Sequence, residues 1–231
     1  MTLTAQFELI GAALANASRA KILCVLMDGR AFTNKELAAA AGIAEPTATA
    51  HLRHLAEAGL TVSLRSGRSV YHRLASGEVA ELLERLGGLT PQPYLHRARR
   101  SLGASDLLGA RSCYSHIAGR LGVLMLDTLM AKGVVALQQE TVAIADPGFF
   151  ADLGIRRPPG RPQAAKLCLD WTERRPHLAG PLGTALMDHA LAQGWLCRGA
   201  PRVLSVTDQG YAAFARHFSL TREEIDRVPD P

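Results

Sequence analysis

The sequence has few cysteines and no recognisable leader. Its 231 residues include four cysteines without a paired spacing, Cys24, Cys113, Cys168 and Cys197. This pattern excludes a disulfide-stapled extracellular scaffold and favours a reducing compartment. The N-terminal residues have no basic segment and include Glu8, so they do not resemble a signal peptide. We therefore expect a cytoplasmic protein.

Long apolar runs and the common catalytic motifs are also absent. The longest apolar run, residues 121–137, is broken by Asp127 and Lys132, so we expect no membrane span and no membrane partner. The sequence contains no Walker loop, no Gly-x-Gly-x-x-Gly, no Gly-x-Ser-x-Gly and no His-Glu-x-x-His. We therefore expect that the protein is not an enzyme.

The composition is that of folded domains with a basic first part. Hydrophobic residues make up 48% of the chain and charged residues 20%, which excludes global disorder. Residues 1–100 carry 12 Lys and Arg against 8 Asp and Glu, whereas residues 101–231 carry 14 against 13. Most of the net charge of +5 therefore lies in the first part, which is compatible with an anionic partner there.

Two proline-rich segments divide the chain. Residues 86–97, LGGLTPQPYLHR, have the composition of a linker, and residues 156–163, RRPPGRPQ, that of a solvated loop. The predicted parts are a first domain, 1–88, and a second domain, 89–231, made of repeats at about 95–155 and about 163–231.

The first domain shows the pattern of a helix-turn-helix. A helix over 33–42 starts with Thr33 and Glu36 at capping-box spacing. After a short turn, Pro46 opens a second helix over 47–59. Two short helices joined by a tight turn are the minimal DNA-binding motif.

A β-hairpin is predicted directly after the second helix. Residues 60–64 and 69–74 are strand-like, and RSGR at 65–68 joins them. Such a wing, with Arg65 and Arg68 at its tip, can reach a phosphate backbone or a minor groove.

With these residues the sequence resembles the ArsR-type winged helix-turn-helix repressors. The resemblance covers most of residues 6–87 and rests on LANASRAKIL at 14–23, KELAAAAGIAEPTATAHLRHLAEAGL at 35–60 and RSGRSVYHRL at 65–74. It implies a homodimeric repressor whose second motif helix enters the major groove of double-stranded operator DNA. The two recognition helices would then lie about 34 Å apart, one turn of DNA.

The outward face of the second motif helix carries side chains suited to DNA. Threonine can hydrogen-bond bases or phosphates, alanine can contact a thymine methyl group, and arginine can bind guanine or a phosphate. The histidines of this helix are either packing residues or contacts. The candidate DNA-binding residues are Pro46, Thr47, Thr49, Ala50, His51, Arg53, Arg65 and Arg68.

The familiar metal sites of that family have no counterpart here. The helix over 33–42 contains no cysteine, and the last helix of the domain, 76–88, contains neither histidine nor cysteine. Cys24 lies in the apolar run ILCVL, which favours a small core residue. A sensor is therefore expected within 95–231.

The second domain carries one element twice. CYSHIAGRLGVLMLDTLMAKG at 113–133 and RRPHLAGPLGTALMDHALAQG at 174–194 align at an offset of 61 residues, with eight identities in the 18 positions from His116 to Gly133. Each copy continues as strand, turn, strand and helix. We predict a mainly α fold with small β-hairpin wings: an N-terminal winged helix-turn-helix, and a C-terminal domain of two winged-helix-like repeats forming an internal pseudo-dimer. This domain also resembles, more loosely, an extension found in a subset of ArsR-type regulators.

The repeated histidines allow two interpretations. His116 and His177 either lie in a close-packed seam between helices or line a ligand pocket. Cys113 and His116 are three residues apart, so on a helix they would share a face. Together with Cys168 and His177 they could supply four ligands to zinc or another thiophilic ion.

Two other sensing chemistries stay open. A redox-sensing cysteine would need a lowered pKa, which Arg111, Arg174 or Arg175 could provide. A small organic anion could be held by Trp171 and the arginine pair, although DWTERR also has the composition of an exposed, charged helix end. The patterns favour a dimeric repressor whose operator affinity is changed by a ligand, metal or redox signal. The alternatives are a constitutive regulator without effector and an enzyme that uses the first Cys–His pair.

Overall fold

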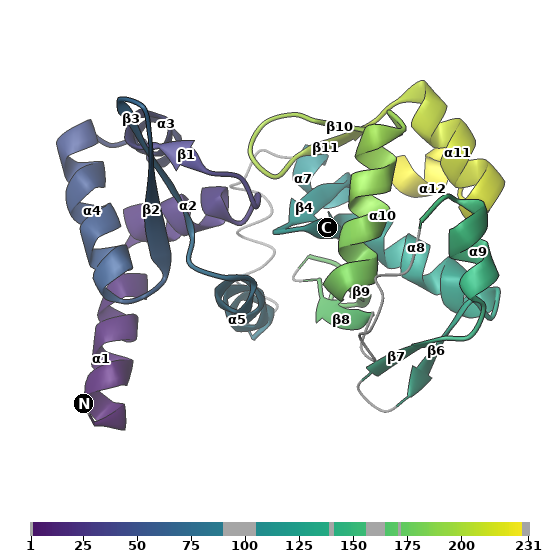
Figure 1. The fold of residues 1–231 in the computed structure, drawn as a ribbon, viewed down its shortest axis with the longest axis horizontal. Helices are drawn as coiled ribbons and strands as arrows, with labels where there is room; N and C mark the ends of the chain where they lie inside the picture. Colours follow the sequence, from purple (N-terminus) through teal and green to yellow (C-terminus); the bar gives the residue numbers. More distant parts are fainter. Residues whose placement is uncertain (1, 90–104, 139–140, 156–164, 171, 228–231) are drawn as a thin grey trace. The chain divides into compact units, whose positions relative to one another are not determined.

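The chain folds as two compact units, Met1–Leu82 and Leu83–Pro231, which are considered separately (Figure 1). The computed structural model describes residues 2–89, 105–138, 141–155, 165–170 and 172–227. Most of the predicted linker at 86–97 and the whole predicted loop at 156–163 lie outside the described residues. The boundary between the units falls within helix α5 (Gly77–Gly88), so this helix contributes to both.

The first unit combines helices with a small antiparallel sheet. Its elements before α5 are α1 (Leu3–Leu14), α2 (Ala17–Leu26), β1 (Phe32–Thr33), α3 (Asn34–Ala41), α4 (Glu45–Glu57), β2 (Thr61–Ser66) and β3 (Ser69–Leu74). The strand order is β1–β3–β2, and β2 and β3 form the hairpin after α4. This is a winged helix-turn-helix, as the sequence predicts.

Local signals set the ends of the two motif helices. Thr33 and Glu36 form a complete capping box, in which each side chain accepts a hydrogen bond from the other residue's backbone N–H. Gly42 ends α3 with a left-handed φ of 69°. Pro46 lies in the first turn of α4, where its missing N–H costs no helical hydrogen bond.

Helix α2 departs from the sequence-based expectation at one residue. Ile22, Leu23 and Leu26 are buried, but Cys24 is exposed. The apolar run ILCVL is continuous, and a helix with 3.6 residues per turn turns part of such a run outward. The prediction of a core role for Cys24 is therefore wrong.

The second unit repeats one order of elements. After the end of α5 its elements are α7 (Ser105–Gly109), β4 (Arg111–Cys113), β5 (His116–Ala118), α8 (Gly119–Ala131), β6 (Val135–Gln138), β7 (Thr141–Ile144), α9 (Pro147–Asp152), β8 (Lys166–Leu169), β9 (Pro176–Ala179), α10 (Gly180–Ala192), β10 (Leu196–Arg198), β11 (Leu204–Val206), α11 (Asp208–Phe218) and α12 (Arg222–Asp226). Hairpin, helix, hairpin and helix follow one another from β4 to α9 and again from β8 to α11. Each hairpin is a two-stranded antiparallel sheet.

The core of this unit is built from the helices of both copies. Its fully or almost fully buried side chains include Leu121, Leu126 and Leu129 of α8, Leu182, Leu186 and Met187 of α10, and Phe214 and Phe218 of α11. Burying a side chain of this size contributes about 1.5–3 kcal/mol. The two copies therefore share one core, and neither buries its apolar face alone.

None of the described helices alone is long and apolar enough to cross a membrane. Helices α1 and α2 have the length and apolar composition of a span only when taken together, and this pair is bent by 87°.

Candidate functional site

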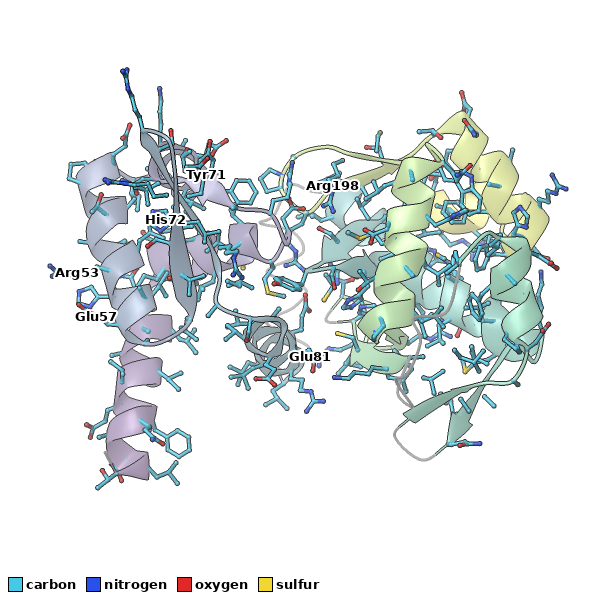
Figure 2. The ribbon with its side chains drawn as sticks, viewed as in Figure 1. Arg53, Glu57, Tyr71, His72, Glu81 and Arg198 are labelled. Carbon is cyan, nitrogen blue, oxygen red and sulfur yellow. The ribbon has the colours of Figure 1, made fainter. Side chains whose placement is uncertain are left out.

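Helix α4 has a buried and an exposed face. Its buried residues Ala48, Leu52 and Leu55 face the interior of the first unit. The exposed residues include five of the predicted DNA contacts, Pro46, Thr47, Thr49, Ala50 and Arg53. Figure 2 shows Arg53 and Glu57 projecting from the outer side of α4. The helix thus presents the face that the sequence predicts.

The outward side chains of α4 differ in how firmly they are held. Asn34 Nδ2 donates to Thr49 Oγ1 at 2.7 Å, which ties α3 to α4. Arg53 and Glu57 form an exposed ion pair at 3.6 Å, with the Arg53 side chain 73% exposed. Exposed pairs of this kind contribute little to stability. Arg53 can therefore leave Glu57 for a base or phosphate at small cost.

His51 has a packing role. It is half-buried, and its Nδ1 lies 3.4 Å from Arg19 Nη1 on α2. Burial, and then the nearby Arg19 charge, lower the pKa of His51. A neutral His51 that accepts a hydrogen bond from Arg19 links α2 to α4.

The wing carries both predicted arginines on its exposed surface. Arg65 lies on β2 opposite Val70. Gly67 and Arg68 form the two-residue turn of the hairpin. Gly67 has a φ of 58°, a conformation that glycine adopts without strain. The tip can therefore bring two positive charges to a phosphate backbone.

A second cluster lies in the other unit, where two hairpins present the same pair of residues. Cys113 of β4 is paired directly with His116 of β5, and Cys168 of β8 is paired directly with His177 of β9. Residues directly opposite in an antiparallel pair project to the same face of the sheet. Each hairpin therefore offers one sulfur and one imidazole ring side by side.

The two pairs face each other in the interior. The Sγ atoms of Cys113 and Cys168 are 3.9 Å apart, and the Nε2 atoms of His116 and His177 are 3.0 Å apart. One ligand atom from each of the four residues can be chosen so that all lie within 4.8 Å of one another, and all four residues are buried. A four-coordinate zinc ion with ordinary bond lengths would require S···S of about 3.8 Å and N···N of about 3.3 Å. The donor set and its spacing fit such an ion.

The ionisable groups of the cluster have pKa values that are shifted in different directions. The hydrogen bond from the Cys113 thiol lowers the pKa of Cys168, although burial raises it. The same hydrogen bond, together with burial, raises the pKa of Cys113. Burial lowers the pKa of His116. The two sulfurs therefore differ in pKa, and the lowered pKa of Cys168 favours the thiolate, which is the form that binds a metal ion.

Two helix glycines let the copies approach this closely. A Cβ on Gly122 of α8 would lie 2.4 Å from the Ile117 carbonyl oxygen and 3.4 Å from the His177 Cβ. A Cβ on Gly183 of α10 would lie 2.5 Å from the Leu178 carbonyl oxygen and 3.1 Å from the His116 Cβ. A side chain at either glycine would therefore press on the histidine of the other copy, so the close-packed seam and the cluster are one structure.

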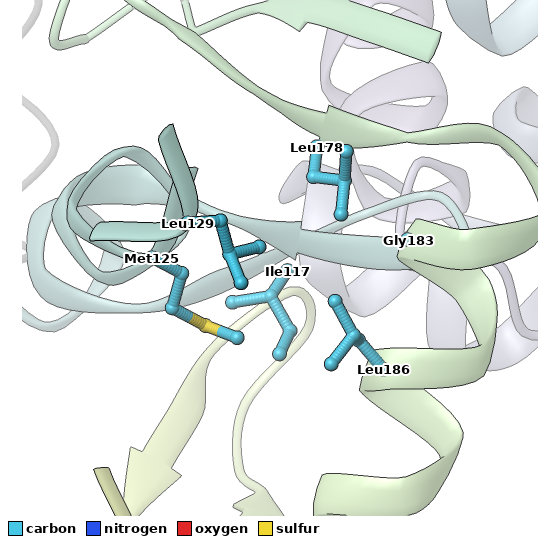
Figure 3. A pocket seen from close by; sticks show the side chains of 7 residues that line it. Ile117, Met125, Leu129, Leu178, Gly183 and Leu186 are labelled. Atoms are coloured by element: carbon cyan, nitrogen blue, oxygen red, sulfur yellow. The ribbon is translucent and has the colours of Figure 1, made fainter. Parts of the chain in front are cut away.

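An apolar pocket lies beside the same two glycines (Figure 3). It is lined by Ile117, Gly122, Met125, Leu129, Leu178, Gly183 and Leu186. Ile117 and Leu178 directly follow the two histidines in the sequence. A lining without polar side chains offers nothing to hold a charged ligand, so the binding chemistry of this region lies in the Cys–His cluster.

A buried ion pair supports the cluster from one side. Arg111 Nη2 and Asp170 Oδ2 are 2.7 Å apart, and both side chains are fully buried. Asp170 Oδ2 also lies 3.8 Å from His177 Nδ1. Burial would raise the pKa of Asp170, but the Arg111 charge and hydrogen bonds from Thr172 and Arg111 hold it below its usual range.

The four clustered residues are those predicted from the sequence, but the first pair lies on a different element. Cys113 and His116 do not share a helix face. They are cross-strand partners in a hairpin whose loop has two residues, and α8 begins only at Gly119. A spacing of three residues fits both a turn of helix and a tight hairpin, and the pairing of residues 111–113 with residues 116–118 makes it a hairpin here.

The other predicted effector residues do not join the cluster. Arg175 is exposed and pairs with Asp127 at 2.7 Å. Arg174 donates from Nη1 to the Gly88 carbonyl oxygen. Trp171 lies outside the described residues. The described residues of this segment, Asp170 and 172–175, lie between β8 and β9 and form no helix end. Asp170 and Thr172, which the sequence analysis did not select as site residues, are buried there. Asp-x-Thr after a strand is a local signal for such a hydrogen-bonded loop.

The helix-turn-helix, its wing and its exposed basic side chains define a winged helix-turn-helix DNA-binding protein. Residues 14–63 match the family described as a helix-turn-helix domain. The HTH-type transcriptional regulator YdfF of Bacillus subtilis is 36% identical over 217 residues, covering 91% of this chain and 96% of that protein. The chain belongs to the HTH-type transcriptional regulators.

Other relatives match less than half of the chain. CmtR of Mycobacterium tuberculosis, also an HTH-type transcriptional regulator, is 36% identical over 106 residues, covering 44% of this chain and 89% of that protein. The solution structure of a homodimeric winged helix-turn-helix domain from Mycobacterium bovis is 30% identical, covers 44% of this chain and 84% of that chain, and has a TM-score of 0.33. Both curated relatives are named transcriptional regulators, which confirms the expectation that this protein is not an enzyme.

Proposed function

We propose that this regulator is a homodimer that binds double-stranded operator DNA and changes its operator affinity when a thiophilic metal ion binds its second unit. The first domain, about 1–88, reads DNA. The remainder, 89–231, is an effector domain of two winged-helix-like repeats. The observation that carries the sensing function is the convergence of four buried sulfur and nitrogen atoms from two hairpins within 4.8 Å.

The DNA-binding surface follows from what α4 and the wing expose. Helix α4 enters the major groove, where Thr47, Ala50 and Arg53 contact base edges or phosphates. Pro46, with Thr49, fixes the start of the helix, and Arg65 and Arg68 contact the backbone or the minor groove beside it. His51 supports the helix from behind, through Arg19.

Exposed apolar side chains support the homodimer. Leu3 and Phe7 of α1 are 64% and 67% exposed, and Leu82 and Leu86 of α5 are also large exposed hydrophobic residues. Exposed apolar groups that gather on single helices mark association surfaces. Pairing through such helices would place two recognition helices about one turn of DNA apart.

The Cys–His cluster would hold the metal ion through Cys113, His116, Cys168 and His177. Two thiolates and two imidazoles form the donor set that zinc and similar ions prefer, and a closed four-ligand site leaves no position for chemistry on a substrate. The ion would supply a cross-link between the two repeats. Reduced thiols are needed for this, which is consistent with a cytoplasmic protein.

A buried contact connects the cluster to α5, the helix shared by the two units. Ser112, next to Cys113, donates from its N–H to the Arg202 carbonyl oxygen at 2.8 Å, and Arg202 Nε donates back to the Ser112 carbonyl oxygen at 3.1 Å. Arg202 Nη2 binds Glu84 Oε1 at 2.7 Å. Glu84 lies on α5, so a shift of β4 on metal binding would reach the helix that continues into the first unit.

The test uses fluorescence anisotropy on DNA from the upstream region of the protein's own gene. We expect sequence-specific binding by the wild type, binding weakened by about 1–3 kcal/mol in Arg53→Ala, and no change in Arg216→Ala, which removes an equally exposed helical arginine elsewhere. Unaltered affinity in a folded Arg53→Ala variant would contradict the assignment of α4.

The metal is tested on the same chain with cobalt(II), in the absence of oxygen. We expect one ion per chain with the strong visible absorption of a tetrahedral thiolate site, lost in Cys113→Ser and Cys168→Ser but kept in Cys197→Ser. A wild-type spectrum without that band would refute the site.

A redox signal is the second candidate, because the Cys113 and Cys168 sulfurs are only 3.9 Å apart. A disulfide bond needs about 2.05 Å, so each sulfur would have to move by about 1 Å. Oxidation by a peroxide would join the sulfurs, remove two electrons and two protons, and yield water. Operator binding that responds to peroxide, but not to zinc, would favour this candidate over the metal.

A further inference from the structure

His177 presents its two ring nitrogens to different surroundings. Nε2 lies 3.0 Å from Nε2 of His116, inside the cluster. Nδ1 is buried, has no hydrogen-bond partner among the described residues, and lies 3.8 Å from Asp170 Oδ2. The nitrogen that points away from the cluster therefore faces a buried carboxylate. Metal-binding histidines commonly direct their second nitrogen toward such a group, which fixes the tautomer.

The Asp170 carboxylate is held rigidly in this position. Its Oδ2 accepts hydrogen bonds from Arg111 Nη2 and the Gly119 N–H, both at 2.7 Å. Its Oδ1 accepts from the Thr172 N–H at 2.9 Å, from Thr172 Oγ1 at 2.6 Å and from the Glu173 N–H at 3.0 Å. Five donors use the acceptor capacity of a carboxylate, which is about four lone-pair sites. Asp170 thus acts on His177 as a fixed negative charge at 3.8 Å, without a full hydrogen bond.

The buried charged side chains around the cluster balance one another until two metal-binding thiolates are added. Among the described residues of the second unit, the buried charged side chains are Glu84, Arg111, Asp170 and Arg202. They form two neutral pairs, Arg111 with Asp170 and Arg202 with Glu84. Two metal-binding thiolates would add two negative charges without a partner. Because uncompensated buried charge is costly, a divalent cation would balance the two negative charges of the thiolates.

We propose that Asp170 is the positioning residue of this centre: it holds His177 in the Nδ1–H tautomer, which leaves Nε2 unprotonated for a divalent ion. Arg111 neutralises Asp170, so the charge of the ion is set by the two thiolates. The proposal rests on the metal-binding function proposed above. In the metal-free protein it requires opposite tautomers, because His116 must then donate from Nε2 to Nε2 of His177.

The first experiment measures zinc affinity by competition with a chromophoric chelator in oxygen-free buffer. The full-length wild type is compared with Asp170→Asn and Asp127→Asn. Asp127 is the matched control, since it also pairs with an arginine, Arg175, but its side chain is 34% exposed whereas that of Asp170 is fully buried. Loss of such an outer partner weakens metal binding by about 10–100-fold. The long contact to His177 places the expected loss near tenfold for Asp170→Asn, with Asp127→Asn unchanged and metal-free operator affinity unchanged in both.

A second measurement does not depend on the variant folding. Nitrogen-15 chemical shifts of the histidine rings in the metal-free wild type report which nitrogen carries the proton. We expect Nδ1–H for His177 and Nε2–H for His116. A folded Asp170→Asn variant that binds zinc as tightly as Asp127→Asn, or an Nε2–H tautomer at His177, would overturn the proposal. A wild type that binds no zinc would refute the metal function instead, and the ring shifts would still decide the role of Asp170.

Discussion

Replacing Gly183 by alanine tests whether the seam between the two repeats is as close as the structure shows. The added Cβ would lie 2.5 Å from the Leu178 carbonyl oxygen and 3.1 Å from the His116 Cβ. Contacts below 3.0 Å force a shift, and here the first neighbour is backbone and cannot rotate away. Overpacking of a buried site costs about 1–3 kcal/mol, against a helix-propensity gain of up to about 1 kcal/mol for alanine over glycine.

The matched control is Gly11→Ala in α1, where an added Cβ would meet nothing within 4 Å. We expect Gly11→Ala to stabilise the first unit slightly, because only the propensity gain applies. Gly183→Ala should lower the free energy of unfolding of the second unit by about 1–2 kcal/mol in urea titrations. It should also weaken zinc binding, because His116 must move. A Gly183→Ala protein as stable as Gly11→Ala would refute the close contact between α10 and the β5 hairpin.

Four further predictions concern the wing, the cap of α3, the His116 ring and the Glu84 contact. Replacing Arg65 and Arg68 by alanine should lower the slope of log affinity against log salt by about 1 for each lost phosphate contact, in anisotropy titrations. Thr33→Ala should destabilise the first unit by about 1 kcal/mol in thermal melts, because the capping box of α3 is lost. The metal-free protein should lose stability as the pH falls below about 6.5, since His116 has a lowered pKa when folded and the unfolded chain takes up the proton first; His116→Gln should flatten that dependence in urea titrations at pH 5 and 7. Glu84→Gln should keep both zinc and operator binding but reduce the effect of zinc on operator affinity, and an unchanged effect would exclude the α5 route.

The winged helix-turn-helix could be predicted because its signals are local. The capping box of Thr33 and Glu36 and the left-handed Gly42 fix the ends of α3 within a few residues of sequence. The exposed face of α4 follows from the helical period of Leu52 and Leu55. Neither inference required knowledge of distant contacts.

The Cys–His cluster could be predicted only in its residue types. Cys113 and His116 are separated by a two-residue loop, whereas Cys168 and His177 are separated by eight residues. The two pairs therefore have different spacings in the sequence but equal places in their hairpins. Strand pairing creates this equivalence, and a spacing rule based on helices cannot reveal it.

The supporting ion pair lay beyond sequence reasoning. Arg111 and Asp170 are 59 residues apart, and each has a charged side chain of a kind that is usually exposed. Their burial depends on the docking of the β8–β9 loop against the start of α8, where Asp170 accepts the Gly119 N–H. Such a contact is a result of the packed second unit as a whole.

The central claim is that metal binding in the second unit changes operator affinity. The most direct test is the dissociation constant for operator DNA, measured by anisotropy at fixed salt with and without one equivalent of zinc. The account predicts a change of at least tenfold, which is about 1.4 kcal/mol of coupling, in the wild type and in Cys197→Ser, and none in Cys113→Ser or Cys168→Ser. Equal dissociation constants with and without zinc, in a wild-type protein shown to bind both zinc and operator, would contradict it.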